Sequence, residues 1–194
     1  ITLDGKDLRK IPQKQLADQI AYVSQDNYLF DDTIRENIRM GNPSATNAEV
    51  EAVAKAANCH DFIMQLEQGY DTLAGDAGDR LSGGERQRIT IARAMLKPSS
   101  VVILDEATAY ADPENEEKME AAIAELVKGK TLVVIAHKLP AIMNADQICV
   151  MDHGKMVATG KHQELIQACP EYQKLWKAAQ DSAEWKVSTA KEGR

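Results

Sequence analysis

Two apolar runs, separated by a segment with helical spacing, constrain the fold of this chain more than any other feature. The runs are Val101–Leu104 and Thr131–Ala136. Strands that are apolar on both faces are typical of the middle of a parallel sheet covered by helices. Between the runs, Pro113 is predicted to open a helix that ends by Gly129. The buried face of this helix would consist of Met119, Ala122, Ile123 and Leu126. Strand, helix and strand predict a right-handed crossover unit, and with it an α/β fold.

The residues before this unit predict a hairpin, a strand and a helical region. Ile1–Leu3, followed by the turn sequence Asp4-Gly5, indicates a hairpin, and Ile20–Val23 indicates a short strand. From Thr33 to about Glu67 the apolar residues have helical spacing. Within that region, Thr46-Asn47-Ala48-Glu49 has the sequence of a capping box, which predicts a helix start.

The remaining segments complete the expected order of elements. A glycine-rich loop, Gly69–Gly84, precedes a helix expected from Glu85 to about Lys97. Near the end of the chain, Ile148–Met151 and Met156–Ala158 predict a second hairpin. After Trp176 the sequence becomes polar, which is typical of a frayed tail.

Composition excludes several classes of protein. The chain has 23 Lys and Arg against 30 Asp and Glu, a net charge of −7, which argues against binding of nucleic acid through bulk charge. No apolar run approaches the roughly 20 residues that a membrane span requires. The three cysteines lie far apart and include no C-x-x-C pair, so the sequence predicts neither a disulfide framework nor a zinc site.

The stretch Leu81–Arg88 combines a helix cap with two glycines. Ser82 is a natural N-cap residue, and Glu85 stands where it completes a capping box. Gly83 and Gly84 would leave the first backbone N–H groups of the helix uncovered. A helix end of this kind carries partial positive charge and unpaired donors, which suit a phosphate oxygen. The same residues are equally compatible with an ordinary helix cap that contains two glycines.

Two acidic residues, Asp105 and Glu106, follow the apolar run Val101–Leu104. The carboxyl ends of parallel strands are where open α/β sheets bind their ligands. Adjacent buried carboxylates are costly unless a metal or a bound water uses them. The first acid could hold Mg²⁺ through water, and the second could polarise an attacking water. The alternative is a solvated strand end with ordinary acids, which fits the apolar run before them less well.

Two further polar residues follow predicted strands. His137 comes after the run Thr131–Ala136 and would emerge at the same sheet edge as Glu106, where it could contact a phosphate. A purely structural role is the alternative for a histidine at a strand end. Gln25 follows Ile20–Val23 in the same manner, and its amide could ligate a metal and hold a water.

In order and spacing, these motifs resemble those of the ABC-type ATPases. The correspondences are Gln25 with the Q-loop glutamine, Leu81–Gln87 with the signature motif, Val101–Glu106 with the Walker B strand, Asp112 with the D-loop aspartate and His137 with the switch histidine. The resemblance extends from Ile1 to about Trp176. It implies an α/β, P-loop NTPase-like (RecA-like) parallel sheet core with an inserted helical signature subdomain.

The resemblance also implies a division of the chain. Residues 1–25 would be the end of the N-terminal β part of the ATPase core, and residues 26–98 the helical subdomain with the signature. Residues 99–175 would be the RecA-like core with Walker B, the D-loop and the switch histidine. Residues 176–194 would be a polar C-terminal tail.

The same resemblance implies ATP and Mg²⁺ as cofactors and assigns a role to each motif residue. Asp105 and Gln25 would order Mg²⁺, Glu106 would be the general base, and His137 would contact the γ-phosphate. Family domains pair head to tail, so that the signature of one copy binds the ATP held by the other. The residues expected to contact nucleotide are Gln25, Ser82, Gly83, Gly84, Gln87 and Asp112.

Two segments resemble the exporter branch of this family. They are Leu29–Ile38 and Gly69–Thr72. In that branch the ATPase domain is often fused behind a membrane domain, so we expect a transmembrane partner to contact the chain near Leu29–Ile38. The resemblance places such a domain at the cytoplasmic face of the membrane, where closure on ATP and release after hydrolysis drive transport.

One element of the family pattern does not occur in this sequence. The chain contains no G-x-x-x-x-G-K-[ST], the loop that cradles the β- and γ-phosphates. Gln25 is preceded by 24 residues, fewer than the family places between that loop and the Q-loop. We therefore expect the chain to begin inside the domain and, by itself, to bind ATP weakly or not at all. The D-loop also departs from the usual Ser-Ala-Leu-Asp, since it reads Ala109-Tyr110-Ala111-Asp112.

Two alternative functions remain at the level of sequence. A soluble ABC protein of DNA repair or translation would usually carry long insertions, and the exporter-like segment Leu29–Ile38 favours the exporter. A non-catalytic interaction module is the alternative from a different class, favoured by the missing phosphate loop. The presence of Gln25, Asp105, Glu106 and His137 favours an enzyme. The transported substrate would touch the membrane domain, so this sequence does not identify it.

Overall fold

The computed structural model describes residues 1–105, 113–136 and 139–180. It divides into two compact units, Ile1–Ile135 and Ala136–Arg194, which are described separately. Among the described residues, no helix combines the length and the apolar character that crossing a bilayer requires. The predicted residues Glu106, Asp112 and His137 lie outside the described part of the chain.

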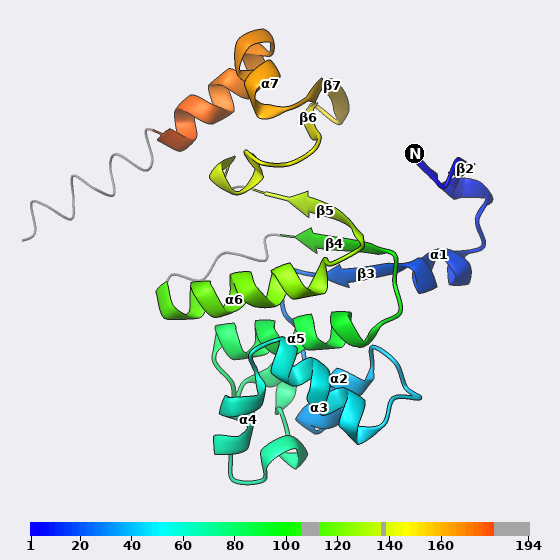
Figure 1. Ribbon diagram of the computed structural model, residues 1–194, viewed down its shortest axis with the longest axis vertical. Coiled ribbons are helices and arrows are strands. Elements are labelled where there is room, and N and C mark those ends of the chain that lie inside the picture. The colour runs from blue at the N-terminus through cyan, green and yellow to red at the C-terminus, as the bar shows by residue number, and fades with distance from the viewer. Residues whose placement is uncertain (106–112, 137–138, 181–194) are drawn as a thin grey trace, which may run out of the picture. The chain divides into compact units, whose positions relative to one another are not determined.

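A three-stranded parallel sheet forms the centre of the first unit (Figure 1). Its strands are β3 (Ile20–Val23), β4 (Val101–Asp105) and β5 (Thr131–Ile135), in the order β3-β4-β5. The pairing aligns Val23 with Leu104 and Asp105 with Ile135, so the three strands end at one edge of the sheet. The predicted α/β fold with a parallel sheet is confirmed.

Helices lie in two layers beside this sheet (Figure 1). α5 (Gly83–Leu96) and α6 (Pro113–Leu126) run along one face of the strands. α2 (Ile34–Arg39), α3 (Asn47–Ala56) and α4 (His60–Gln65) lie beyond α5. The capping boxes predicted at Thr46 and Ser82 are both present. α5 begins at Gly83, two residues before the predicted start at Glu85, because the Ser82 cap already fixes the first turn.

The smaller elements of the first unit also follow the local sequence. The predicted hairpin is formed by β1 (Thr2–Leu3) and β2 (Lys6–Asp7), with positive φ angles at the turn residues Asp4 and Gly5. Between the hairpin and β3 lie the 3-10 helix η1 (Leu8–Lys10) and helix α1 (Gln13–Gln19). Two further 3-10 helices, η2 (Gly69–Asp71) and η3 (Asp76–Gly78), occupy the glycine-rich loop before α5.

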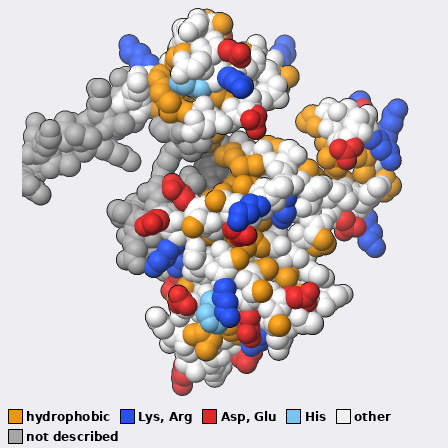
Figure 2. Space-filling view, in the orientation of Figure 1, with side chains coloured by type: hydrophobic (Ala, Val, Ile, Leu, Met, Phe, Trp, Pro, Cys, Tyr) orange, Lys and Arg blue, Asp and Glu red, His pale blue; other side chains and the backbone are white. Residues whose placement is uncertain are grey.

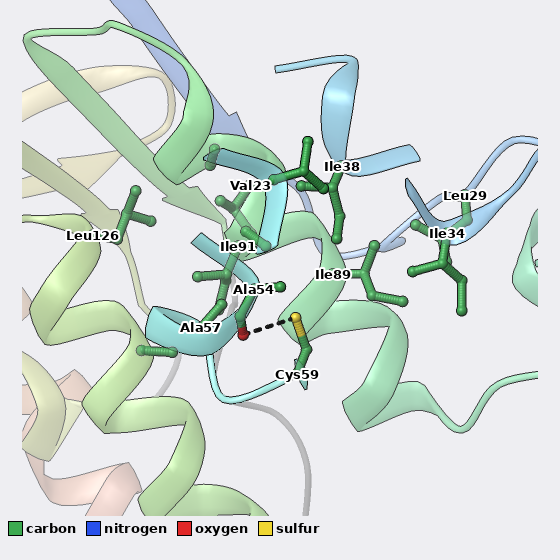
Figure 3. Close-up of a cluster of buried hydrophobic side chains, with 14 of the residues drawn as sticks. Val23, Leu29, Ile34, Ile38, Ala54, Ala57, Cys59, Ile89, Ile91 and Leu126 are labelled. Atoms are coloured by element: carbon green, nitrogen blue, oxygen red, sulfur yellow. Dashed lines mark hydrogen bonds between the residues drawn. The ribbon is translucent and has the colours of Figure 1, made fainter. Parts of the chain in front are cut away.

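The core of the first unit lies mainly between α5 and the helices α2 to α4 (Figure 3). Its fully buried side chains include Leu29, Ile34, Ile38, Ile89 and Ile91. Cys59 belongs to this cluster and donates a hydrogen bond from Sγ to the carbonyl of Ala54, at 3.2 Å. Burial raises the pKa of the Cys59 thiol to about 12, so the thiol stays protonated at neutral pH. The three cysteines of the chain are free thiols.

The predicted burial holds for β4 but is wrong for β5. Val102 and Leu104 of β4 are 0% and 3% exposed, whereas all five residues of β5 are exposed. In the described residues β5 pairs only with β4, and the exposure of all five of its residues shows that no helix covers it on either face. An apolar strand therefore lies at an edge, and Figure 2 shows apolar side chains gathered over the strands of this unit.

The second unit is built on the predicted C-terminal hairpin. β6 (Ile148–Asp152) and β7 (Lys155–Gly160) pair antiparallel, and the turn residues His153 and Gly154 have positive φ angles. The 3-10 helix η4 (Leu139–Ile142) precedes the hairpin, and α7 (His162–Ala168) follows it. The small core consists of Leu139, Ile148, Val150, Leu165, Cys169 and Tyr172.

The chain remains helical over residues 170–180, so 176–180, which were expected to belong to a polar tail, form part of a helix. The reason is tertiary. The ring of Trp176 lies 4.6 Å from that of His162, centroid to centroid, and the His162 Nδ1 lies 2.9 Å from the hydroxyl of Tyr172. These contacts hold the helix against α7, although most of its exposed residues are polar.

Candidate nucleotide-binding site

The N-terminus of α5 has the geometry predicted for the signature motif. Ser82 has an extended backbone, and its side chain accepts a hydrogen bond from the backbone N–H of Glu85, at 3.3 Å. The Glu85 carboxylate in turn accepts from the N–H of Ser82, at 2.8 Å. Gly83 and Gly84 carry the first N–H groups of the helix, which have no acceptor within it, and are only partly buried. This helix end therefore fits a phosphate oxygen.

The next turn of α5 is buried. Gln87, which we predicted in the nucleotide site, is 1% exposed, and Arg88 is 6% exposed. The guanidinium of Arg88 lies over the ring of Phe62 in α4, 5.2 Å from its centroid. Burial lowers the pKa of Arg88. These two side chains anchor α5 inside the unit, while Ser82, Gly83 and Gly84 stand at its accessible end.

Two predicted site residues lie at the carboxyl edge of the sheet. Asp105 is the last residue of β4, and Gln25 stands in the turn after β3, two residues beyond Val23. The β3–β4 register aligns Val23 with Leu104, so both polar residues lie at the same edge, as predicted. Asp105 is half-buried and Gln25 is exposed.

Tyr22 contacts the Asp105 carboxylate and was not identified from the sequence. Its hydroxyl donates a hydrogen bond to Oδ2 of Asp105, at 2.8 Å. This hydrogen bond is the main reason that the pKa of Tyr22 is raised. The signal that would have found it is the strand register, because Tyr22 pairs with Ile103 and so shares a sheet face with Asp105.

Asn27 was also missed, and it connects the Gln25 turn with α5. It has a positive φ of 46° and is 2% exposed. Its Nδ2 donates to the carbonyl of Gln25, at 3.0 Å. Its Oδ1 lies 3.1 Å from the hydroxyl of Thr90, in the second half of α5. Asn is one of the few residues that adopt this backbone conformation readily, which was the only local sign.

A buried asparagine, Asn37, organises the segment Leu29–Ile38 that we predicted to face a membrane partner. Asn37 is fully buried; its Oδ1 accepts from the N–H of Phe30, and its Nδ2 donates to the carbonyls of Phe30 and Thr33, at 2.9, 2.9 and 3.1 Å. Arg93 of α5 donates from Nε to the carbonyl of Asn37, at 2.7 Å, and from a second nitrogen to its Oδ1, at 2.9 Å. The segment is therefore fixed to the signature helix.

Arg93 also borders a surface pocket. A third nitrogen of its guanidinium donates to the carbonyl of Tyr28, at 3.2 Å, and burial lowers its pKa to about 10. The pocket has a volume of about 380 Å³ and is lined in part by Tyr28, Phe30, Met40 and Lys97. Tyr28 and Phe30 pack edge to face, and both are 48% exposed. Exposed aromatic rings around a pocket are typical of a surface that meets another protein.

The described residues fit Mg²⁺ and ATP in part. Asp105 supplies the oxygen ligand that Mg²⁺ prefers, and Mg²⁺ usually takes one or two carboxylates together with substrate phosphates and water. Within the described part of the chain, no group of three or more His, Cys, Asp and Glu residues could hold a metal alone. The donor set thus suits a metal that arrives with a nucleotide, and the uncovered N–H groups of α5 suit the phosphates.

Comparison with known proteins identifies the family. A family model described as ABC transporter matches residues 1–109. The chain is 47% identical over 175 residues to an ATP-dependent lipid A-core flippase of Syntrophus aciditrophicus, and 46% identical over 177 residues to the heavy metal tolerance protein of Schizosaccharomyces pombe. These alignments cover 90% and 91% of the chain but only 29% and 21% of the two relatives.

A solved structure gives the same result. The structure of a bacterial Atm1-family ABC exporter with ATP bound superposes with a TM-score of 0.82 at 39% sequence identity. The superposition covers 90% of this chain and 31% of that one. The parallel sheet, the capped signature helix and the strand-end aspartate thus occur in the order of this family, with the P-loop NTPase fold. The chain belongs to the ABC transporter family.

Proposed function

We propose that this chain is part of the ATP-hydrolysing domain of an ABC exporter, which couples ATP binding and hydrolysis to transport across a membrane. The observation that carries the proposal is the Ser82 capping box, which presents Gly83 and Gly84 at the start of α5. The names of a lipid A-core flippase and of a structurally similar ABC exporter support export as the role. Because the chain spans less than a third of either, we further propose that it lies within a longer protein, called here the full-length protein.

We assign the chemistry to the residues as follows. Asp105 and Gln25 hold Mg²⁺ at the sheet edge, where the metal, when bound, neutralises charge on the phosphates. Glu106 accepts the proton of the attacking water, and His137 donates a hydrogen bond to the γ-phosphate. Tyr22 occupies one oxygen of Asp105 and so fixes the orientation of the carboxylate. Of the proposed boundaries we keep 1–25 and 26–98, whereas the unit proposed to end at residue 175 extends to residue 180 because Trp176 packs against it.

The signature would act on a second copy of the domain. In a head-to-tail pair, Ser82, Gly83 and Gly84 of one copy bind the phosphates of ATP that the other copy holds. The partial positive charge at the start of α5 favours the closed pair when ATP is present. Gln87 supports this end from the interior of the unit, and Asp112 is proposed to contact the nucleotide as the D-loop aspartate. Hydrolysis removes the bridging phosphate and lets the pair open.

The experiment that tests the function compares this chain with the full-length protein. We expect the full-length protein to release phosphate from ATP and to stop when EDTA removes Mg²⁺. We expect the isolated chain to bind Mg-ATP with a dissociation constant above about 1 mM, because its sequence contains no phosphate-cradling G-x-x-x-x-G-K-[ST] loop. A phosphate-release assay measures the ATPase activity of the full-length protein, and titration calorimetry measures ATP binding by the isolated chain. Micromolar binding by the isolated chain, or a full-length protein without ATPase activity, would contradict the proposal.

The membrane partner is proposed to dock at the pocket formed by Tyr28, Phe30 and Met40, on the cytoplasmic side of the membrane. We expect a photo-crosslinking amino acid at Phe30 of the full-length protein to form crosslinks with residues outside this chain, identified by mass spectrometry. The control is the same amino acid at Met64, an apolar position of α4 that is 58% exposed. At this position we expect no crosslinks with residues outside this chain. Equal crosslinking at both positions would argue against a docking site at Phe30.

A further inference from the structure

We infer that the contact between Asn27 and Thr90 is the joint through which the Gln25 turn and the signature helix α5 move together. The inference rests on the proposed function, in which Gln25 faces Mg²⁺ and α5 faces the nucleotide of a second copy. It concerns two positioning residues that touch neither ligand. The Thr90 hydroxyl lies 3.1 Å from Oδ1 of Asn27, although the two residues are 63 positions apart in the sequence.

In the Gln25 turn, the side chain of Asn27 is hydrogen-bonded to the backbone of Gln25. Its Nδ2 donates to the Gln25 carbonyl at 3.0 Å, which closes a short turn with the backbone of Asn27 in the left-handed region. Asn27 is 2% exposed, whereas the side chain of Gln25 is exposed. A displacement of Gln25 by a ligand therefore reaches a side chain that is fixed inside the unit.

On the side of the helix, Thr90 joins that side chain to the backbone of α5. Its single hydroxyl hydrogen is shared between two acceptors, the carbonyl of Gln87, one turn closer to the signature, at 2.8 Å, and Oδ1 of Asn27 at 3.1 Å. Thr90 is 8% exposed, and its neighbours Ile89 and Ile91 are fully buried (Figure 3). Thr90 also lines the pocket beside Arg93, but with so little of it exposed, breaking its polar contact costs free energy.

A second anchor shows why this contact serves the Gln25 turn in particular. One turn further along α5, Arg93 donates hydrogen bonds to the carbonyls of Tyr28, which lines the docking pocket, and of Asn37, in the segment Leu29–Ile38. Helix α5 thus contacts the residues after β3 at two points. Thr90 contacts Asn27 in the Gln25 turn, and Arg93 contacts the residues beside the docking pocket. Removing the Thr90 hydroxyl should release the Gln25 turn from α5 and leave the contacts of Arg93 in place.

If the joint exists, removing it should lower turnover without lowering nucleotide affinity, because neither Asn27 nor Thr90 contacts ATP in the proposed function. In the full-length protein we expect Thr90→Val, which keeps the shape but removes the hydroxyl, to lower kcat about five- to tenfold with KM for ATP changed less than about twofold. Thr90→Ser, which keeps the hydroxyl, should retain kcat within about twofold. Asn27→Ala, which also removes the hydrogen bond to the Gln25 carbonyl and strains the backbone at a positive φ, should lower kcat at least as much as Thr90→Val.

Hydrogen–deuterium exchange supplies a second readout in the same proteins. We expect the backbone amides of residues 25–28 to exchange faster in Thr90→Val than in Thr90→Ser, with exchange around Arg93 unchanged. Equal kcat and equal exchange rates in the two Thr90 variants would overturn the inference of a joint. If the unmodified protein has no ATPase activity, the proposed function fails. In that case the exchange rates alone test the joint, and equal rates at residues 25–28 in both variants overturn it.

Discussion

Replacing Glu106 with glutamine in the full-length protein is expected to lower ATP turnover by at least about a hundredfold while ATP still binds. Glutamine has the size of glutamate and keeps an oxygen for hydrogen bonding, but its amide does not accept a proton from water. Binding depends on phosphate and metal contacts that this change leaves in place. With hydrolysis blocked, the ATP-bound closed pair of domains should accumulate.

The measurements are steady-state phosphate release and the amount of ATP retained after rapid removal of free nucleotide. A matched control is Glu120→Gln, which makes the same chemical change on an exposed face of α6 and should leave turnover within about twofold. Undiminished ATPase activity in Glu106→Gln would count decisively against Glu106 as the general base. Loss of retained ATP would instead show that Glu106 contributes to binding.

Replacing Asn37 with alanine is expected to destabilise this chain by about 3 kcal/mol, one of the larger effects available to a single substitution. Asn37 is fully buried, accepts hydrogen bonds from the N–H of Phe30 and from Arg93, and donates to the carbonyls of Phe30 and Thr33. Alanine would leave these groups without the amide in a place that water does not reach easily. The half-buried charge of Arg93 would also lose one of its oxygen partners.

Urea denaturation followed by circular dichroism measures this effect, and the midpoint should fall by more than about 1 M, given typical denaturant slopes. Asn42→Ala is the control, because Asn42 lies just after α2 and its side chain accepts a single exposed hydrogen bond from the N–H of Ser44. It should change the free energy of unfolding by less than about 1 kcal/mol. If the two variants were equally stable, the Asn37 network would not hold the segment Leu29–Ile38.

Much of the secondary structure could be predicted from short stretches of sequence. The strands at Ile20–Val23 and Val101–Asp105 follow from continuous apolar runs, and the helix starts at Thr46 and Ser82 follow from capping boxes. Each of these signals lies within four or five residues, the range over which backbone sterics and side-chain caps act. The polar residues at the ends of β3 and β4 could be assigned to one edge of the sheet because the carboxyl ends of parallel strands share an edge.

The predictions that proved wrong depended on what lies next to an element. The run at Thr131–Ile135 is as apolar as its neighbour, yet β5 is an exposed edge strand in the described structure. Residues 176–180 are polar enough for a tail, yet they are helical, and Trp176 packs against the buried His162. Apolar character shows that a segment could be buried, but only the arrangement of neighbouring elements shows whether it is.

By itself, the sequence determined the order of the sheet strands, the two hairpins and the helices α3, α5 and α6, the capped start of α5 and the acidic end of β4. The tertiary structure decided which side chains hold these parts in position. Tyr22 reaches Asp105 across 83 positions, Thr90 reaches Asn27 across 63, and Arg93 reaches Asn37 across 56. Such contacts depend on strand register and on helix packing, which bring distant residues together at hydrogen-bond distance. No local spacing encodes them, because each partner looks like an ordinary polar residue within its own segment.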